Sequence, residues 1–233
     1  MDLNNIKNYF LQPIQNLQKL KPLFSVKPEE KISLLPEDQI CCQVTAVSYR
    51  KIVDRPSALG DWLLIDDFFN EEKHCIYVNH SLKTVILGYR GTIVTNIKDL
   101  MSDVQIILGV ATIDERVKES LMVYDSLREK FPDYKKRICG HSLGGTICYI
   151  VAKHRIPDRC TVFNPGSSLN QLFVQMLTNT IQGLPRTQQV YTYKILGDPV
   201  SLFSFVGTTK IFTVPKVDPL ALHALNNFVS SLP

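Results

Sequence analysis

The amino-acid sequence predicts an α/β domain in which a mostly parallel central sheet is covered by helices on both faces. The length of 233 residues suits one domain of this kind. From residue 136 onward, short apolar runs alternate with stretches of helical periodicity. Such alternation is typical of parallel sheets, which bind ligands at the carboxyl ends of their strands. The chemistry is therefore expected at those strand ends.

Residues 1–36 differ in pattern from the rest of the chain. Apolar residues recur at roughly helical spacing from Leu3 to Leu20, with lysines among them, and Pro13 interrupts the run. This pattern predicts a helical arm packed on a main domain of residues 37–233. A helix that lies on a membrane surface is the alternative interpretation.

The sequence of the first half of the main domain predicts two helices and a hairpin. A helix is expected over 37–53, where Leu35-Pro36-Glu37-Asp38 gives a start signal. The β-rich runs His74–Val78 and Thr84–Tyr89 are separated by a turn-like segment and predict an antiparallel hairpin. A pattern resembling a capping box begins a long helix over Thr112–Lys130.

The second half predicts an alternation of strands and helices. The strands are expected at Lys136–Gly140, Cys160–Phe163, Val190–Leu196 and Lys210–Val214. The helices are expected at 143–154, 168–181 and 220–231.

Composition and charge exclude several classes of protein. Hydrophobic residues make up 45% of the chain and charged residues 21%, as in ordinary globular proteins. The net charge of +4 is far from the strong basic bias of nucleic-acid-binding proteins, although it suits a transient contact with an anionic lipid surface. No run approaches the roughly 18 apolar residues of a membrane span, and the polar N-terminus does not resemble a secretory signal.

The cysteines favour a reducing compartment. The six cysteines form no C-x-x-C pair, and three of them lie in apolar runs, where a thiol acts as a small hydrophobic group. We expect reduced thiols and an intracellular, cytoplasmic protein. The sequence indicates neither a metal site nor a cofactor.

The segment Gly140–Gly145 carries the strongest functional signal. Its G-x-S-x-G pattern falls at a predicted strand-to-helix junction, where such a serine stands on a sharp, strained turn. Side chains two residues before or after the serine would collide with the neighbouring strand or helix. Ser142 is therefore the predicted nucleophile, and the backbone N–H of Leu143 is a predicted oxyanion donor.

A serine nucleophile needs a histidine base held by a carboxylate, in the chain order serine, acid, histidine. Of the five histidines, His223 alone follows the last predicted strand. The others are earlier in the chain or close to the serine: His74, His80, His141 and His154. His223 is expected at the start of the final helix.

Asp198 is the favoured carboxylate because it follows a predicted strand within Gly197-Asp198-Pro199. Asp218, five residues before His223, is the rival. Asp158 precedes a strand and so lies at the wrong end of the sheet. A second oxyanion donor is expected at Thr92, which can offer its N–H and its hydroxyl. The alternative is that Gly91-Thr92 is only the end of a strand.

At these residues the sequence resembles the class 3 lipases, the fungal triacylglycerol-lipase-like branch of the α/β hydrolases. The matching stretches follow the family order between about residues 38 and 230: Val85–Thr92, Asp99–Asp103, Gly140–Gly145, Phe163–Gly166, Gly197–Val200 and His223–Leu225. The resemblance implies the α/β-hydrolase fold, a triad of Ser142, Asp198 and His223, and an oxyanion hole of Thr92 and Leu143. It also implies a lipid ester as substrate.

In that family the segment after the oxyanion threonine forms a lid. Here it contains Ile93, Val94 and Ile97, which are expected to cover an apolar pocket. Asp103 resembles the family's acidic residue beyond the lid and is interpreted as structural. Two departures stand out: there is no sign of a secretory signal or disulfides, and residues 164–168 lack the basic residue that the fungal enzymes often have there.

Three functions remain open at this stage. The leading one is hydrolysis of carboxylic ester bonds of acylglycerols or phospholipids through an acyl-serine intermediate. An acyltransferase would use the same triad and pass the acyl group to an alcohol. A non-catalytic lipid-binding protein with the same fold is the third. The oligomeric state stays open.

Overall fold

The computed structural model describes residues 28–66, 71–93, 112–166, 189–201, 204, 206–216 and 218–229. In this part of the chain, eight strands form one sheet in sequence order. Strands β1 to β4 pair antiparallel, and β4 to β8 pair parallel. The strands are β1 (Ala58–Leu59), β2 (Trp62–Leu64), β3 (His74–Asn79), β4 (Thr84–Tyr89), β5 (Lys135–His141), β6 (Arg159–Phe163), β7 (Gln189–Ile195) and β8 (Thr208–Phe212). The mostly parallel sheet confirms the predicted fold class.

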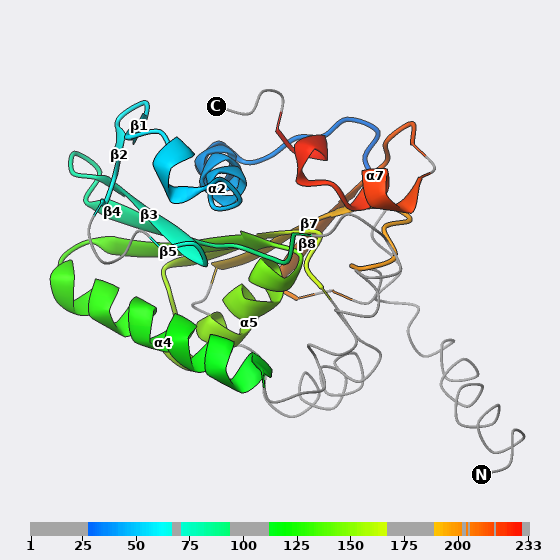
Figure 1. Ribbon diagram of the computed structural model, residues 1–233. Helices are drawn as coiled ribbons and strands as arrows, with labels where there is room; N and C mark the ends of the chain where they lie inside the picture. Colours follow the sequence, from blue (N-terminus) through cyan, green and yellow to red (C-terminus); the bar gives the residue numbers. More distant parts are fainter. Residues whose placement is uncertain are drawn as a thin grey trace, which may run out of the picture.

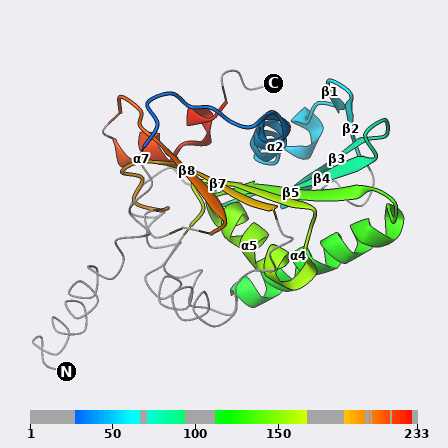
Figure 2. The same ribbon diagram turned by 180° about the vertical axis from the view of Figure 1, so that it is seen from behind.

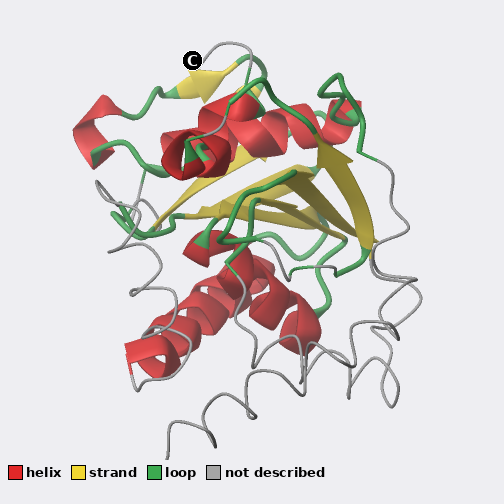
Figure 3. Cartoon of the chain, turned by 90° about the vertical axis from the view of Figure 1, so that its right-hand side faces the viewer, coloured by secondary structure: helices red, strands yellow, loops and turns green. Residues whose placement is uncertain are grey.

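Helices cover both faces of this sheet, so the molecule has three layers (Figure 1). Helices α4 (Thr112–Lys130) and α5 (Leu143–Arg155) lie on one face. Helices α2 (Pro36–Val47) and α7 (Pro219–His223) lie on the other, and the view from behind shows the same arrangement (Figure 2). Figure 3 shows the sheet edge-on between the two helical layers.

The antiparallel hairpin predicted in the first half is confirmed by β3 and β4. Their register pairs Cys75 with Gly88 and Tyr77 with Ile86, and every residue of both strands is buried. Successive side chains of a strand point to opposite faces. Val85, Leu87 and Tyr89 therefore face α4 and α5, whereas Ile86 faces α2.

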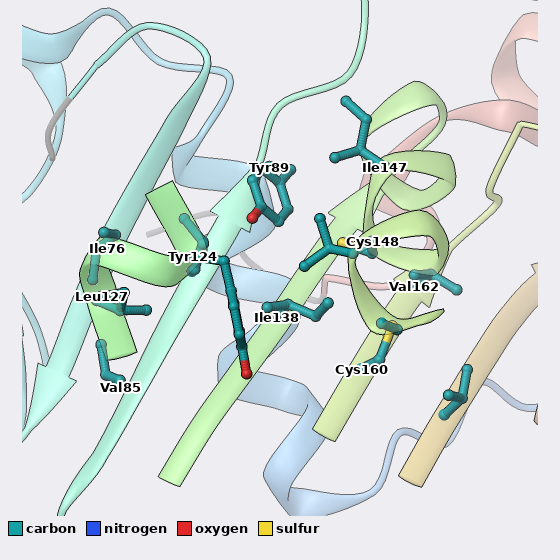
Figure 4. Close-up of a cluster of buried hydrophobic side chains, with 14 of the residues drawn as sticks. Ile76, Val85, Tyr89, Tyr124, Leu127, Ile138, Ile147, Cys148, Cys160 and Val162 are labelled. Carbon is teal, nitrogen blue, oxygen red and sulfur yellow. The ribbon is translucent and has the colours of Figure 1, made fainter. Parts of the chain in front are cut away.

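The largest core cluster fills the space between the sheet and helices α4 and α5 (Figure 4). Tyr124 and Leu127 of α4 and Ile147 of α5 meet Ile138 of β5 there, and all are at most 2% exposed. Each such side chain stabilises the fold by about 1.5–3 kcal/mol relative to an exposed position. Cys148 and Cys160 belong to the same cluster, and all six cysteines are buried and free of disulfides.

A buried ion pair fixes α2 on the opposite face. The carboxylate of Asp38 accepts two hydrogen bonds of 2.7 Å from the guanidinium of Arg159 on β6. It also accepts from the hydroxyls of Thr161 and Tyr193, each at 2.6 Å. The attraction between the two charges and the hydrogen bonds from the two hydroxyls offset the cost of burying the Asp38 carboxylate. The pair therefore holds α2 against β6 and β7.

Two predicted helices are shorter than expected. The one over 37–53 ends at Val47, and a short 3-10 helix, η2 (Ile52–Asp54), follows it. The one over 220–231 is only α7, followed by extended Ala224 and the 3-10 helix η3 (Leu225–Asn227). The reason is that side chains from elsewhere in the fold donate to the carbonyls of Leu222 and His223. His223 is thus the last residue of α7, and its expected place at a helix start is wrong.

The remaining boundaries agree with those expected to within two residues, and β1 and β2 were not predicted. The expected helix 168–181 and residues 1–27 of the N-terminal arm lie outside the described residues. Within the arm, Glu29 forms backbone hydrogen bonds with Ile211 and Thr213, beside β8. Among the described helices, none combines the length and apolar character needed to cross a membrane.

Candidate active site

Ser142 stands at the turn between β5 and α5. It is the residue that precedes the helix, with φ 56° and ψ −127°, a conformation that side chains other than glycine rarely adopt. Its backbone is held on both sides. Its N–H donates to the carbonyl of Phe163 at 3.3 Å, and its carbonyl accepts from the N–H of Gly166 at 3.0 Å.

The glycines around Ser142 are required by close approaches. A Cβ atom on Gly140 would lie 2.5 Å from the carbonyl group of Gly144. A Cβ atom on Gly144 would lie 2.2 Å from the carbonyl oxygen of Tyr89, and one on Gly145 would lie 2.9 Å from Pro165. The start of α5 therefore packs directly on the backbone of the sheet, as the spacing of the glycines predicts.

Asp198 and His223 form a buried hydrogen-bonded pair. Both Asp198 oxygens lie 3.1 Å from His223 Nδ1, and the two residues are 1% and 5% exposed. An ionised carboxylate only accepts, so Nδ1 carries the proton and Nε2 is left as the basic nitrogen. Asp198 lies in the turn that follows β7, three residues after Ile195, and the short α7 brings His223 to it from 25 residues further along the chain.

Further donors hold the Asp198 carboxylate in place. Its Oδ2 accepts from the Ser201 hydroxyl at 2.6 Å, and its Oδ1 accepts from the Val200 N–H at 3.1 Å. Burial by itself would raise the pKa of Asp198. The hydrogen bond and charge of His223, followed by the bonds from Ser201 and Val200, outweigh burial and lower the pKa below its ordinary value. The carboxylate is therefore ionised at neutral pH.

Ser142 Oγ and His223 Nε2 are the two buried polar atoms that the site leaves without partners. Neither has a hydrogen-bond partner among the described residues. A buried polar atom without a partner costs about 1–3 kcal/mol, so each such atom calls for an explanation. The hydrogen bonds of a catalytic site often tighten only when substrate is bound.

Gly91 brings the end of β4 next to the serine. A Cβ atom on Gly91 would lie 3.3 Å from Ser142 Cβ and 2.6 Å from the carbonyl oxygen of His141. Thr92 follows directly and is half-buried. Leu143 is the first residue of α5, where backbone N–H groups have no acceptor within the helix. Leu143 follows Ser142 directly, and Thr92 follows a glycine that lies against it; their role as oxyanion donors stays a prediction.

The rival residues have other roles in the structure. Asp218 accepts from the Ala221 N–H at 2.7 Å and so caps the start of α7. Asp158 accepts from the Lys136 N–H at 2.7 Å, at the amino end of β5. The described residues contain no group of three or more histidine, cysteine or acidic side chains that could hold a metal ion.

The predicted lid is described only at its first residue. Ile93 is 64% exposed, whereas Val94 and Ile97 lie outside the described residues. A second exposed apolar side chain, Leu196, stands two residues before Asp198 and is 52% exposed. The role of the segment as a lid stays a prediction.

Sequence reasoning missed four side chains that support the pair. Ser201 binds Asp198, as described above. His141 was considered only as a base, yet its Nε2 lies 2.8 Å from the carbonyl oxygen of His223. The Asn164 amide donates to the same oxygen at 3.0 Å, and the Tyr49 hydroxyl lies 3.0 Å from His141 Nδ1. Asn164 lies inside a matched stretch and Ser201 directly after one, which could have drawn attention to them, whereas nothing in the sequence marks Tyr49.

No protein-family model and no curated protein matches the sequence. Solved structures do resemble it. A triacylglycerol lipase from Penicillium expansum is similar with a TM-score of 0.50 and 15% identity, over 79% of this chain and 80% of the other. The Lip2 lipase from Yarrowia lipolytica has a TM-score of 0.49 and 16% identity, over 79% and 83% of the two chains.

The strand order and the similarity to the Penicillium expansum structure agree with each other. This chain places a mostly parallel sheet between helices, and the similarity covers 79% of it. At 15% identity, the similarity establishes the architecture and nothing about chemistry. The chain has the α/β-hydrolase fold.

Proposed function

We propose that this protein is a serine hydrolase that cleaves carboxylic esters of lipids through an acyl-serine intermediate. The observation that carries the proposal is the buried Asp198–His223 pair, whose histidine ring lies 4.6 Å from the ring of His141, the residue directly before Ser142 in its strained turn. The free nitrogen of His223 and the hydroxyl of Ser142 both lack partners among the described residues. These are the two groups between which a serine hydrolase moves a proton.

In the first half of the proposed reaction, Ser142 Oγ attacks the ester carbonyl carbon while His223 Nε2 takes the hydroxyl proton. The carbonyl oxygen becomes an oxyanion, which accepts hydrogen bonds from the N–H groups of Leu143 and Thr92. Each donor is expected to supply a factor on the order of 10²–10³ in rate. The intermediate then collapses, and His223 returns its proton to the leaving alcohol.

In the second half, a water molecule attacks the acyl-serine. His223 Nε2 takes a proton from the water, and a second oxyanion forms at the same donors. Collapse breaks the bond to Ser142 Oγ, to which His223 returns the proton, and the carboxylic acid leaves. Asp198 stays ionised throughout and stabilises the imidazolium that forms in each half.

A lipid ester is proposed as substrate on three grounds. The motifs of the sequence resemble those of the class 3 lipases, and the fold is that of a triacylglycerol lipase. Ile93 and Leu196 are exposed apolar side chains that flank the ends of β4 and β7, close to Thr92 and Asp198. An apolar rim of this kind suits an acyl chain and contact with a lipid surface.

The test is hydrolysis of p-nitrophenyl esters of increasing chain length, followed by triglyceride emulsions and phospholipid vesicles. The wild-type protein should release p-nitrophenol, and the Ser142→Ala variant should show only the uncatalysed rate. Full activity of the Ser142→Ala variant would exclude Ser142 as the nucleophile. Addition of a competing alcohol separates hydrolysis from acyl transfer, because only transfer makes the new ester the main product.

A further inference from the structure

The backbone carbonyl of His223 accepts two side-chain hydrogen bonds. Asn164 Nδ2 donates to it at 3.0 Å, and His141 Nε2 lies 2.8 Å away. Asn164 Nδ2 also donates to the carbonyl of Leu222 at 3.1 Å. The last residues of α7 are thus held by groups at the carboxyl ends of β5 and β6, not by further turns of helix.

Asn164 is itself held rigidly. It is fully buried, its Oδ1 accepts from the Ile195 N–H at 2.9 Å, and its own N–H donates to the carbonyl of Tyr193 at 2.9 Å. The Asp198 N–H in turn donates to the carbonyl of Ile195 at 3.2 Å. One side-chain amide therefore connects the backbone of His223 to the end of β7, from which Asp198 emerges.

The same turn also contacts the nucleophile. Gly166, two residues after Asn164, donates its N–H to the carbonyl of Ser142, and its own carbonyl accepts from the hydroxyl of Thr146 at 2.8 Å. The residues that carry the acid, the base and the nucleophile are thus all tied to the segment 164–166.

We propose that Asn164 is a positioning residue, whose amide fixes His223 against Asp198 and beside Ser142. This inference rests on the proposed function and deepens it. Asn164 touches none of the reacting atoms and acts through the backbone of His223 and Ile195. A displacement of about 1 Å in a catalytic group can cost roughly 10²-fold in rate. Because the hydrogen bond from Asn164 fixes the backbone carbonyl of His223, its loss is expected to lower kcat.

Asparagine suits both the backbone conformation and the hydrogen bonds of position 164. Its φ of 38° lies in the left-handed region, which asparagine adopts more readily than most residues. Its amide offers a donor for the two carbonyls and an acceptor for the Ile195 N–H. An ionised aspartate of the same shape could accept from Ile195 but could not donate to His223.

The test compares Asn164→Gly and Asn164→Asp with Asn227→Ala. Glycine keeps the backbone conformation and removes only the amide. Asn227 is the matched control, because its amide donates to Ala221 and Leu222 of the same helix, at 2.8 and 3.1 Å, without contacting His223. Each variant is assayed on p-nitrophenyl butyrate and examined by proton NMR for the downfield signal of the His223 Nδ1–H.

We expect both Asn164 variants to lose about 10- to 100-fold in kcat with little change in KM, and to lose or broaden the NMR signal. Asn227→Ala should keep the wild-type kcat and the wild-type NMR signal. Equal losses of kcat in Asn164→Gly and Asn227→Ala would mean that Asn164 only holds α7 in place, which would overturn the inference. A wild-type kcat and a wild-type NMR signal in Asn164→Gly would overturn it as well. If the wild-type protein cleaves no ester, the proposed function fails, while the NMR comparison still reports whether Asn164 holds the Asp198–His223 bond.

Discussion

His141 Nε2 lies 2.8 Å from the backbone carbonyl oxygen of His223, and the two imidazole rings stand 4.6 Å apart. A carbonyl only accepts, so Nε2 of His141 carries the proton. Its Nδ1 is then the acceptor for the Tyr49 hydroxyl at 3.0 Å. The same hydroxyl also donates to the carbonyl oxygen of His141 at 3.3 Å, so the neutral ring satisfies all these contacts without a proton on Nδ1.

The pH dependence of folding should report this neutral histidine. Burial, together with the charge of His223, lowers the pKa of His141 to about 3. The unfolded chain, with an ordinary histidine pKa near 6.5, binds a proton that the folded protein does not. The free energy of unfolding should thus be highest above about pH 6.5 and fall as the pH is lowered, by up to about 1.4 kcal/mol per pH unit for this one group.

Urea unfolding at pH 7.5, 6.5, 5.5 and 4.5 measures this slope. His141→Gln should give a shallower decline than the wild-type protein, because the titrating group is absent. His154 is exposed, and His154→Gln is the control that should keep the wild-type slope. Equal slopes in all three proteins would mean that His141 does not stay neutral in the folded state.

Replacement of Asp198 should damage catalysis far more than binding. In Asp198→Asn, an amide NH₂ can face His223 Nδ1 and favour the tautomer with the proton on Nε2, which cannot act as a base. We expect kcat to fall by roughly 10³–10⁴, with KM nearly unchanged. Ser201→Ala removes only the 2.6 Å bond to Asp198 and should cost less than about tenfold. Equal, small losses in both variants would argue against Asp198 as the orienting acid.

Thr92 allows a test of the hydroxyl as an oxyanion donor. Thr92→Val keeps the shape and the N–H and removes the hydroxyl. If the hydroxyl binds the oxyanion, kcat should fall by about 10²-fold, and Thr92→Ser should restore most of the loss. A valine variant with the wild-type kcat would limit the contribution of Thr92 to its backbone.

The buried ion pair on the other face of the sheet should matter for stability and not for chemistry. Asp38→Ala leaves the guanidinium of Arg159 buried without its carboxylate and should lower the free energy of unfolding by about 3–5 kcal/mol. Asp125 pairs with Arg155 on the surface, so Asp125→Ala should have a much smaller effect. Chemical denaturation of the two variants beside the wild-type protein makes the comparison, and similar losses would contradict the proposed importance of burial.

Local patterns predicted those parts of the fold that local interactions determine. The runs around Cys75 and Ile86 predicted a hairpin because their β-branched and aromatic residues flank a turn. Helix α4 was predicted with its observed ends, since its start and stop signals lie in the sequence itself. The glycines around Ser142 predicted a close approach, and the contacts of Gly140 and Gly144 explain why no larger residue fits.

Long-range contacts determined what the sequence could not predict. The final helix stops at His223 because Asn164, 59 positions away, and His141, 82 positions away, bind its last carbonyl. Tyr49 reaches His141 from 92 positions away. Hydrophobic periodicity does not predict such long-range pairings, so the supporting residues of the site can be identified only once the strands are placed side by side.

The central claim is that Ser142 is an activated nucleophile, and covalent labelling tests it most directly. The native protein is incubated with a fluorophosphonate, digested, and analysed by mass spectrometry to locate the adduct. The proposed function predicts one adduct, on Ser142, that is absent from the heat-denatured protein and from Ser142→Ala. A native protein that stays unlabelled, or an Ser142→Ala variant that is labelled to the same extent, would contradict it.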